Sequence, residues 1–231
     1  MRRGAVLAID SSTRAAYVAV EVDGCLAAEE TVTARANASS ALLPAVDRAV
    51  RAAGVAPAEL AAVVVGGGPG SFTGLRIAAA TAKGIVRALG VPLYAYSGLL
   101  AAAAACRDGG GPVCALFDAR NREVFGGCWR FGAGVEEVLG VTAAGIDQVV
   151  ERLRGWPVRF VGEGALLHRA LLAEAFGPEA VAEEERSAAA GLLWLARAVP
   201  DLGRVEDAAA WEPDYVRAAG VERIAAARGA A

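Results

Sequence analysis

The sequence of 231 residues contains few of the side chains that most hydrolytic and metal-dependent sites require. Its one histidine, His168, rules out a site with two histidine ligands and leaves a Ser-His-Asp triad a single possible base. The four cysteines, Cys25, Cys106, Cys114 and Cys128, have no CxxC spacing and lie mostly in strand-like or alanine-rich stretches. We therefore expect reduced thiols, no metal site, a half-buried or surface histidine, and a cytoplasmic location.

Long apolar runs and a large net charge are also missing. No run reaches the roughly 18 apolar residues that a membrane span requires. Arg2 and Arg3 lead directly into a short apolar strand, without the longer apolar region of a signal peptide. The net charge of −3 argues against nucleic-acid binding by this chain alone. We expect a globular protein with no membrane contact, and nucleic-acid contact only where a partner shares it.

The most informative stretch is the glycine-rich segment 66–77, GGGPGSFTGLRI. It follows an apolar run typical of a buried strand, and it opens a helical run of small residues that extends to residue 89. Ser71 or Thr73 can cap this helix. A strand, a glycine loop and a helix N-terminus together suggest an anion cradle, although neither the Walker A nor the dinucleotide fingerprint matches. The alternative is a tight turn that seats the helix against the sheet or a partner.

Residue patterning predicts the element order βββαβαβα in the first half, which is that of a ribonuclease-H-like lobe. The expected strands are 5–9, 16–22, 26–32, 58–65 and 90–96. The expected helices are 76–89, 99–106 and, before them, one that extends to about residue 53 and for which 37–40 offer N-caps. Pro44 should fall in the first turn of its helix. The segment 108–112 is the best candidate linker, dividing the chain into lobes 1–107 and 112–231, with packing of the C-terminal helix back on the first lobe as an open alternative.

The second half repeats part of this pattern. Asp10 to Tyr17 and Asp118 to Phe125 are each seven residues apart, in matching strand–turn–strand units. This indicates a duplicated, reduced lobe, with two similar hairpins arising by chance as the alternative. The sequence also predicts the following elements: strands 113–117, 123–131 and 157–161, and helices 146–153, 165–176 and 187–199, the last ended by Pro200.

Four stretches carry a family resemblance, in order along nearly the whole chain. They are AIDSST at 8–13, GPGSFTGLRI at 68–77, FDAR with EVF at 117–125, and PDYVR at 213–217. Together they resemble the TsaB (YeaZ) family. The resemblance implies an α/β ASKHA (actin, sugar kinase, Hsp70-like) fold with two ribonuclease-H-like lobes. Older naming groups such proteins with M22-like glycoproteases, but no metal-ligand pair or triad supports proteolysis here.

The resemblance also implies a function. Family members are non-catalytic partners of the TsaD subunit in the machinery that places a threonylcarbamoyl group on the adenosine beside the anticodon of tRNAs reading ANN codons. They form a heterodimer with TsaD that recruits TsaE and contacts tRNA indirectly, and they lack the metal-binding histidines of TsaD. We expect no cofactor in this chain, with ATP only at the interface or in the partner. One departure is Ala38, which stands before Ser39 where many relatives have histidine.

In this family the helix after the glycine loop and the helix before it bundle with the partner's equivalent helices. The resemblance assigns the interface here to Leu42, Val46, Ser71, Phe72, Thr73, Leu75, Arg76, Ala78, Ala79 and Ala82. An Ala82→Glu change should then break the complex and leave the monomer folded. The alternative is that these faces pack on their own sheet.

Two other functions stay open. A nucleotide-dependent kinase or hydrolase would use Asp10, Ser11, Ser12 and Asp118, because ASKHA hairpins approach phosphates and metal at these turn positions. Its weak point is the lack of a clear adenosine loop, for which 162–164 is the only candidate. The third possibility is a homodimer that forms when the chain is alone, through the surface that binds TsaD.

Overall fold

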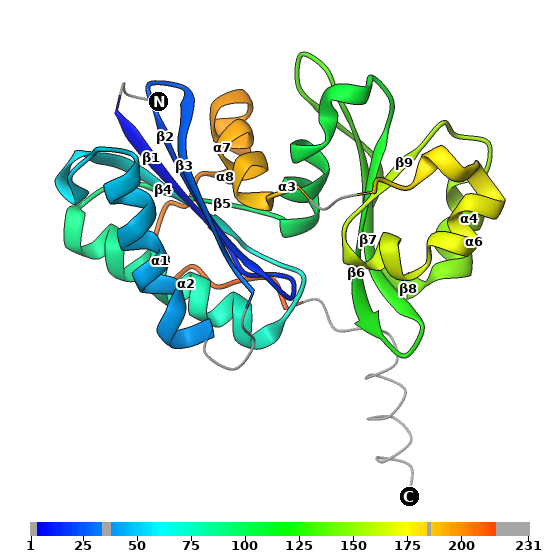
Figure 1. Cartoon of the computed structure of the whole chain (residues 1–231), viewed down its shortest axis with the longest axis horizontal. Helices are drawn as coiled ribbons and strands as arrows, with labels where there is room; N and C mark the ends of the chain where they lie inside the picture. Colours follow the sequence, from blue (N-terminus) through cyan, green and yellow to red (C-terminus); the bar gives the residue numbers. More distant parts are fainter. Residues whose placement is uncertain (1–3, 34–37, 184–185, 216–231) are drawn as a thin grey trace, which may run out of the picture.

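The computed structural model describes residues 4–33, 38–183 and 186–215. It has two lobes that lie side by side, each built on one mixed sheet (Figure 1). Within the described residues, no helix combines the length and apolarity needed to cross a bilayer.

The first lobe contains β1 (Ala5–Asp10), β2 (Ala16–Val22), β3 (Cys25–Val32), β4 (Leu60–Gly66) and β5 (Leu93–Tyr96), in the order β3-β2-β1-β4-β5. β1 to β3 form an antiparallel meander, and β4 and β5 add in parallel. This is the arrangement of a ribonuclease-H-like lobe. Alternate residues of the strands face opposite sides. Leu7 and Ile9 enter one core cluster, whereas Val6 and Ala8 enter another.

Two helices cover each face of this sheet. α1 (Ala38–Ala52) and α2 (Phe72–Leu89) pack on one face, while α3 (Gly98–Ala105) and α7 (Ala188–Ala198) pack on the other (Figure 1). The Ser71 hydroxyl caps α2 by accepting a hydrogen bond from the Gly74 amide at 3.3 Å, and Ser97 caps α3 in the same way. α2 ends at Gly90, whose φ of 68° is left-handed.

The second lobe contains β6 (Val113–Arg120), β7 (Glu123–Phe131), β8 (Val135–Gly145) and β9 (Arg159–Val161), in the order β8-β7-β6-β9. This repeats β3-β2-β1-β4, with the same antiparallel and parallel pairings. The helices α4 (Ile146–Leu153), α5 (Glu163–Leu167) and α6 (Arg169–Phe176) follow β8 and β9. The predicted fold class, two ribonuclease-H-like lobes of which the second is reduced, is confirmed.

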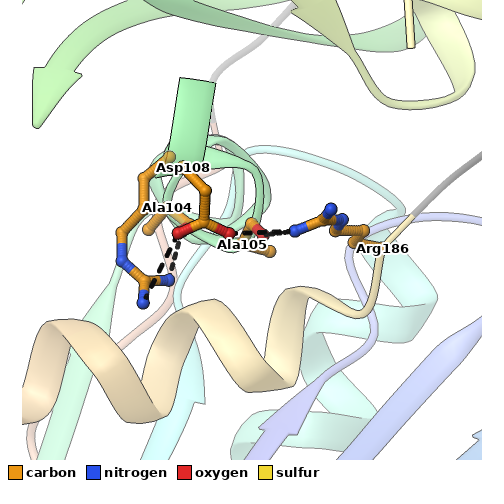
Figure 2. A network of polar contacts seen from close by, with 5 residues as sticks. Ala104, Ala105, Asp108 and Arg186 are labelled. Carbon is orange, nitrogen blue, oxygen red and sulfur yellow. Dashed lines mark hydrogen bonds and ion pairs between the residues drawn. The ribbon is translucent and has the colours of Figure 1, made fainter. Parts of the chain in front are cut away.

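The chain returns to the first lobe after α6. α7 packs against α3 and the first sheet, and the Tyr96 hydroxyl donates a hydrogen bond to the Val199 carbonyl at 3.1 Å. Figure 2 shows the start of this return, where Arg186 points at the carboxylate of Asp108 and is 3.2 Å from it. The short helix α8 (Pro200–Gly203) and residues 204–215 also lie on the first lobe. The second sheet therefore begins at Val113, near the predicted boundary, but the segment from 186 to 215 belongs physically to the first lobe.

Several local predictions differ from the structure. β8 was not predicted, because register shifts in its pairing with β7 interrupt the period-two pattern. α1 already begins at Ala38, so Pro44 lies inside the helix rather than in its first turn. The expected helix 165–176 is divided at His168, which has φ −105° and ψ 21°. Pro200 lies just after the end of α7, as expected, but it is also the first residue of α8, because proline suits the first turn of a helix.

Candidate functional site

A cleft of about 810 Å³ lies between the two lobes. The first lobe contributes the turn after β1 (residues 11–14) and the loop and first turns of α2 (residues 70–74 and 77). The second lobe contributes residues 117–120 at the end of β6, Phe125 and Glu163. Three of the stretches that carry the family resemblance thus meet at one place.

The glycine loop packs directly on the turn after β1. The Ser71 amide donates a hydrogen bond to the Ser12 carbonyl at 2.7 Å. A Cβ atom at Gly70 or Gly74 would come closer than 3.0 Å to the backbone oxygen of Ser12 or Ser11, respectively. The glycines are therefore required for close backbone approach inside the lobe. Of the two interpretations of the loop, the turn that seats a helix accounts for these glycines.

Residues 213–215 of the fourth recognised stretch reach the same loop, while its residues 216 and 217 lie outside the described part of the chain. The Asp214 amide donates to the Gly67 carbonyl at 2.7 Å. The rings of Phe72 and Tyr215 lie 5.1 Å apart, and the Arg76 guanidinium is 5.2 Å from the centre of the Phe72 ring. Phe72 remains 58% exposed. Residues 214 and 215 thus support the glycine loop and the first turn of α2, and the Phe72 ring stays at the surface.

Asp10 is enclosed rather than open to the cleft. Its side chain is fully buried and accepts hydrogen bonds from the Ser12 hydroxyl at 2.7 Å and the Ser12 amide at 3.2 Å. Gly66 and Gly98 pack against its carboxyl group, where a side chain at Gly66 would overlap it. Burial raises the pKa of Asp10, and the hydrogen bonds from Ser12 oppose that shift. A water-bridged metal needs a carboxylate that water can reach, so Asp10 supports the turn instead.

The other candidate nucleotide residues, Ser11, Ser12 and Asp118, do line the cleft. Asp118 accepts a hydrogen bond from the Arg120 amide at 2.8 Å. Arg14 crosses from the first lobe and lies 3.9 Å from the Asp118 carboxylate and 3.5 Å from the Glu163 carboxylate. Nucleotide binding by these residues stays a prediction.

Sequence reasoning did not single out Arg14, and it considered Glu163 only as part of 162–164, the weak candidate for an adenosine loop. Glu163 follows β9 as the glycine loop follows β4, and a Cβ atom at Gly164 would lie 2.8 Å from the Leu116 carbonyl. The internal repeat was the signal that could have identified this position.

The predicted interface residues divide into two groups. Ser71, Phe72, Thr73 and Arg76 are exposed. The remaining six pack in the chain's own core with 0–6% exposure: Leu42, Val46, Leu75, Ala78, Ala79 and Ala82. In this structure those six have almost no surface to offer a partner, as the alternative interpretation held. The expectation that Ala82→Glu leaves the monomer folded is therefore corrected, because the new carboxylate would be buried without a partner.

The cysteines and His168 are the remaining side chains that a metal or catalytic site could use. Cys106, Cys114 and Cys128 are buried, Cys25 is exposed, and all four are free thiols. His168 is half-buried between α5 and α6. Across residues 4–33, 38–183 and 186–215, no three His, Cys, Asp or Glu side chains are grouped so that they could hold a metal ion.

Comparison with known proteins adds the family context. A family model described as TsaD, tRNA N6-adenosine threonylcarbamoyltransferase, matches residues 31–190. The tRNA threonylcarbamoyladenosine biosynthesis protein TsaB of Bacillus subtilis (strain 168) is 32% identical over 177 residues, which are 74% of this chain and 76% of that protein.

Two solved structures from Pseudomonas aeruginosa share the fold over almost the whole chain. The structure of YeaZ has a TM-score of 0.74 and 27% identity, and covers 92% of this chain and 100% of its own. An uncharacterized protein with similarity to peptidase YeaZ has a TM-score of 0.76 and 29% identity, and covers 93% and 100%. The likeness therefore extends over both lobes.

Proposed function

Because this chain belongs to the TsaB (YeaZ) family, we propose that it is a non-catalytic partner and activator of a TsaD-type transferase. That enzyme adds a threonylcarbamoyl group to the adenosine next to the anticodon of tRNAs reading ANN codons. TsaE joins through the complex of the two subunits, and the tRNA is bound mainly by the partner. We place any nucleotide of the complex in the partner or at the interface, because Asp10 is enclosed in this chain.

The observation that carries this proposal is an exposed apolar surface on α1 and α2. We call it the outer helical face, and its members are Leu43, Phe72, Arg76, Ala80 and Gly84. Leu43 and Phe72 are 59% and 58% exposed, so both side chains have apolar surface available to a partner. Residues 72, 76, 80 and 84 are spaced four apart, so they form one ridge along α2. Small residues at 80 and 84 allow another helix to approach closely.

The family relation explains which partner suits this face. The family model described as TsaD matches residues 31–190, which include α1 and α2, so we expect a TsaD-type protein to have its own copy of these two helices. Two similar faces can pack about an approximate two-fold axis into a four-helix bundle. Burial of Leu43 and Phe72 would contribute about 1.5–3 kcal/mol each before the costs of association. The same geometry permits a homodimer when the partner is absent.

The test is size-exclusion chromatography with light scattering on this chain, alone and mixed with the TsaD-type subunit of its own organism. We expect a new species at the summed mass and the loss of any homodimer. Gly84→Gln should weaken that species strongly, because the position is open in the monomer and no atom lies within 4 Å of an added Cβ. Ala170→Gln, at an exposed position of α6, is the matched control.

Each outcome has a distinct meaning. If the wild-type chains form no complex at micromolar concentrations, the partner function is wrong. If the complex forms and Gly84→Gln joins it as tightly as Ala170→Gln does, the partner function stands and the outer helical face is the wrong surface.

A further inference from the structure

The β6–β7 hairpin has arginines at positions where glycine is the usual residue. Arg120 pairs with Glu123, so Asn121 and Arg122 form a two-residue loop. The φ angles of residues 120, 121 and 122 are 68°, 51° and 64°, all left-handed. Positive φ at both loop positions is typical of a type I′ turn, which favours Asn followed by Gly. Arg122 occupies the glycine position, and Arg120 lies beside a bulge in β6, another common place for glycine.

Left-handed backbone is unfavourable for a long side chain such as arginine. Glycine at positions 120 and 122 would relieve this strain and would give an equally tight hairpin. The turn itself therefore does not explain the two arginines, and their guanidinium groups need another reason to be there.

One of the two arginines borders the cleft, and the other is two residues further along, in the hairpin loop. Arg120 lines the cleft, and residues 120–122 are exposed. Neither Arg120 nor Arg122 has an ion pair among the residues that the structure describes. The nearby carboxylates of Asp118 and Glu163 are both contacted by Arg14 instead. Phe72 and Thr73, at the start of α2, border the same cleft, so the hairpin tip lies near the outer helical face.

We propose that Arg120 and Arg122 bind the phosphodiester backbone of the RNA that the TsaD-type partner holds. This inference rests on the proposed function. Guanidinium groups bind phosphate oxygens with two parallel hydrogen bonds. An exposed tip beside the partner's docking surface can reach a bound RNA, whereas a small nucleotide inside the cleft would meet the carboxylates of Asp118 and Glu163. The net charge of −3 makes this contact weak in the isolated chain, so it operates in the complex.

The experiment uses Arg120→Gly and Arg122→Gly, singly and together, in the complex with the transferase subunit. Three quantities are measured for each: the thermal midpoint of the free chain, assembly of the complex, and the affinity of the complex for its tRNA at several salt concentrations. Glycine suits the left-handed backbone, so the thermal midpoint should not fall and assembly should be normal. Arg152→Ala, at an exposed position of α4 in the same lobe, is the control.

Affinity for tRNA should fall with each change. For a double helix, the logarithm of affinity changes with the logarithm of salt concentration by about 0.9 per phosphate contact, so each arginine removed should lower the affinity about fivefold at roughly 0.15 M salt. The slope of log affinity against log salt should also become less steep by about one for each arginine removed. Arg152→Ala should change neither quantity.

Three results would overturn the inference. Normal tRNA affinity in an assembled double variant shows that the arginines do not contact RNA. A lower thermal midpoint for both glycine variants shows that the side chains stabilise the hairpin. Loss of ATP binding by the free variants, with tRNA affinity intact, assigns the arginines to a nucleotide. A wild-type chain that joins no complex is a different result, because it removes the proposed function itself.

Discussion

Two glycines of the same helix should respond to alanine with opposite signs. Gly84 lies in the interior of α2, where alanine gains about 0.5–1 kcal/mol of helix propensity, and Gly74 lies in the first turn, where the gain is at most that large. At Gly84 an added Cβ meets no atom within 4 Å, and the full gain should appear as stability. For a chain of this size that is a rise of about 1–4 °C in the thermal midpoint.

At Gly74 the added Cβ would lie 2.0 Å from the Ser11 carbonyl oxygen, and real Cβ atoms do not approach closer than 3.0 Å. The helix and the turn after β1 must therefore separate by about 1 Å, and overpacking of this kind costs about 1–3 kcal/mol. Ser11 is nearly buried, and its neighbour Ser12 is bonded to Asp10 and Ser71, so the turn cannot move freely. After the propensity gain, Gly74→Ala should be less stable than wild type by up to about 2 kcal/mol.

The assay is urea denaturation of the two variants and the wild type, followed by far-ultraviolet circular dichroism. The order of midpoints should be Gly84→Ala, then wild type, then Gly74→Ala. If Gly74→Ala is as stable as Gly84→Ala, the glycine loop is not held against the turn, and the interpretation of its glycines as close-packing residues is refuted.

Two further changes test the core of the first lobe. Asp10→Asn keeps acceptor and donor groups for Ser12 and removes the buried charge, so it should be more stable than wild type near pH 8. Burial raises the pKa of Asp10 in the folded protein above the unfolded value of 3.8. The contribution of Asp10 to wild-type stability is therefore complete below pH 3.8, where the carboxyl group is protonated, and it is lost as the pH rises through the folded pKa. The stability advantage of Asp10→Asn should therefore shrink toward acid pH, and an advantage that does not change with pH would contradict the raised pKa of Asp10. Ala82→Glu should lose about 3–5 kcal/mol of stability, because it buries an unpaired carboxylate, while Ala80→Glu on the exposed side should lose almost nothing. Equal urea midpoints for these two variants would show that α2 is oriented differently.

Local chemistry made most of the first lobe predictable from the sequence. Its strands follow short apolar runs, and its helices α2 and α3 are capped by Ser71 and Ser97; these signals act within a few residues. β8 was missed because its bulges break the period on which strand prediction depends. The face that α2 presents to its own sheet was also hidden, because small residues lie on both sides of the helix. Ala82 is buried and Ala80 is exposed, although the two are the same residue type.

Burial was also the property of the site that the sequence did not reveal. The sequence pattern identified the four stretches and suggested that Asp10 and Asp118 play equivalent parts. The order of the strands supports that equivalence, since β6 repeats β1. Burial separates the two residues, and burial depends on segments that arrive from elsewhere in the chain.

Asp10 and Asp118 differ in burial because the second lobe has no full counterpart of β5 and α3 among its described residues. In the first lobe β5 leads into α3, and Gly98 at the start of α3 closes over Asp10 and Ser12. In the second lobe the place of β5 is taken by a single bridge between Phe160 and Val181. The helix that follows, α7, packs on the first lobe instead. No described helix therefore covers Asp118 as α3 covers Asp10. The Asp118 side chain keeps 24% of its surface exposed, and Arg14 can reach it across the cleft. The reduction of the second lobe thus exposes the charged end of β6, together with the hairpin arginines that we assign to RNA.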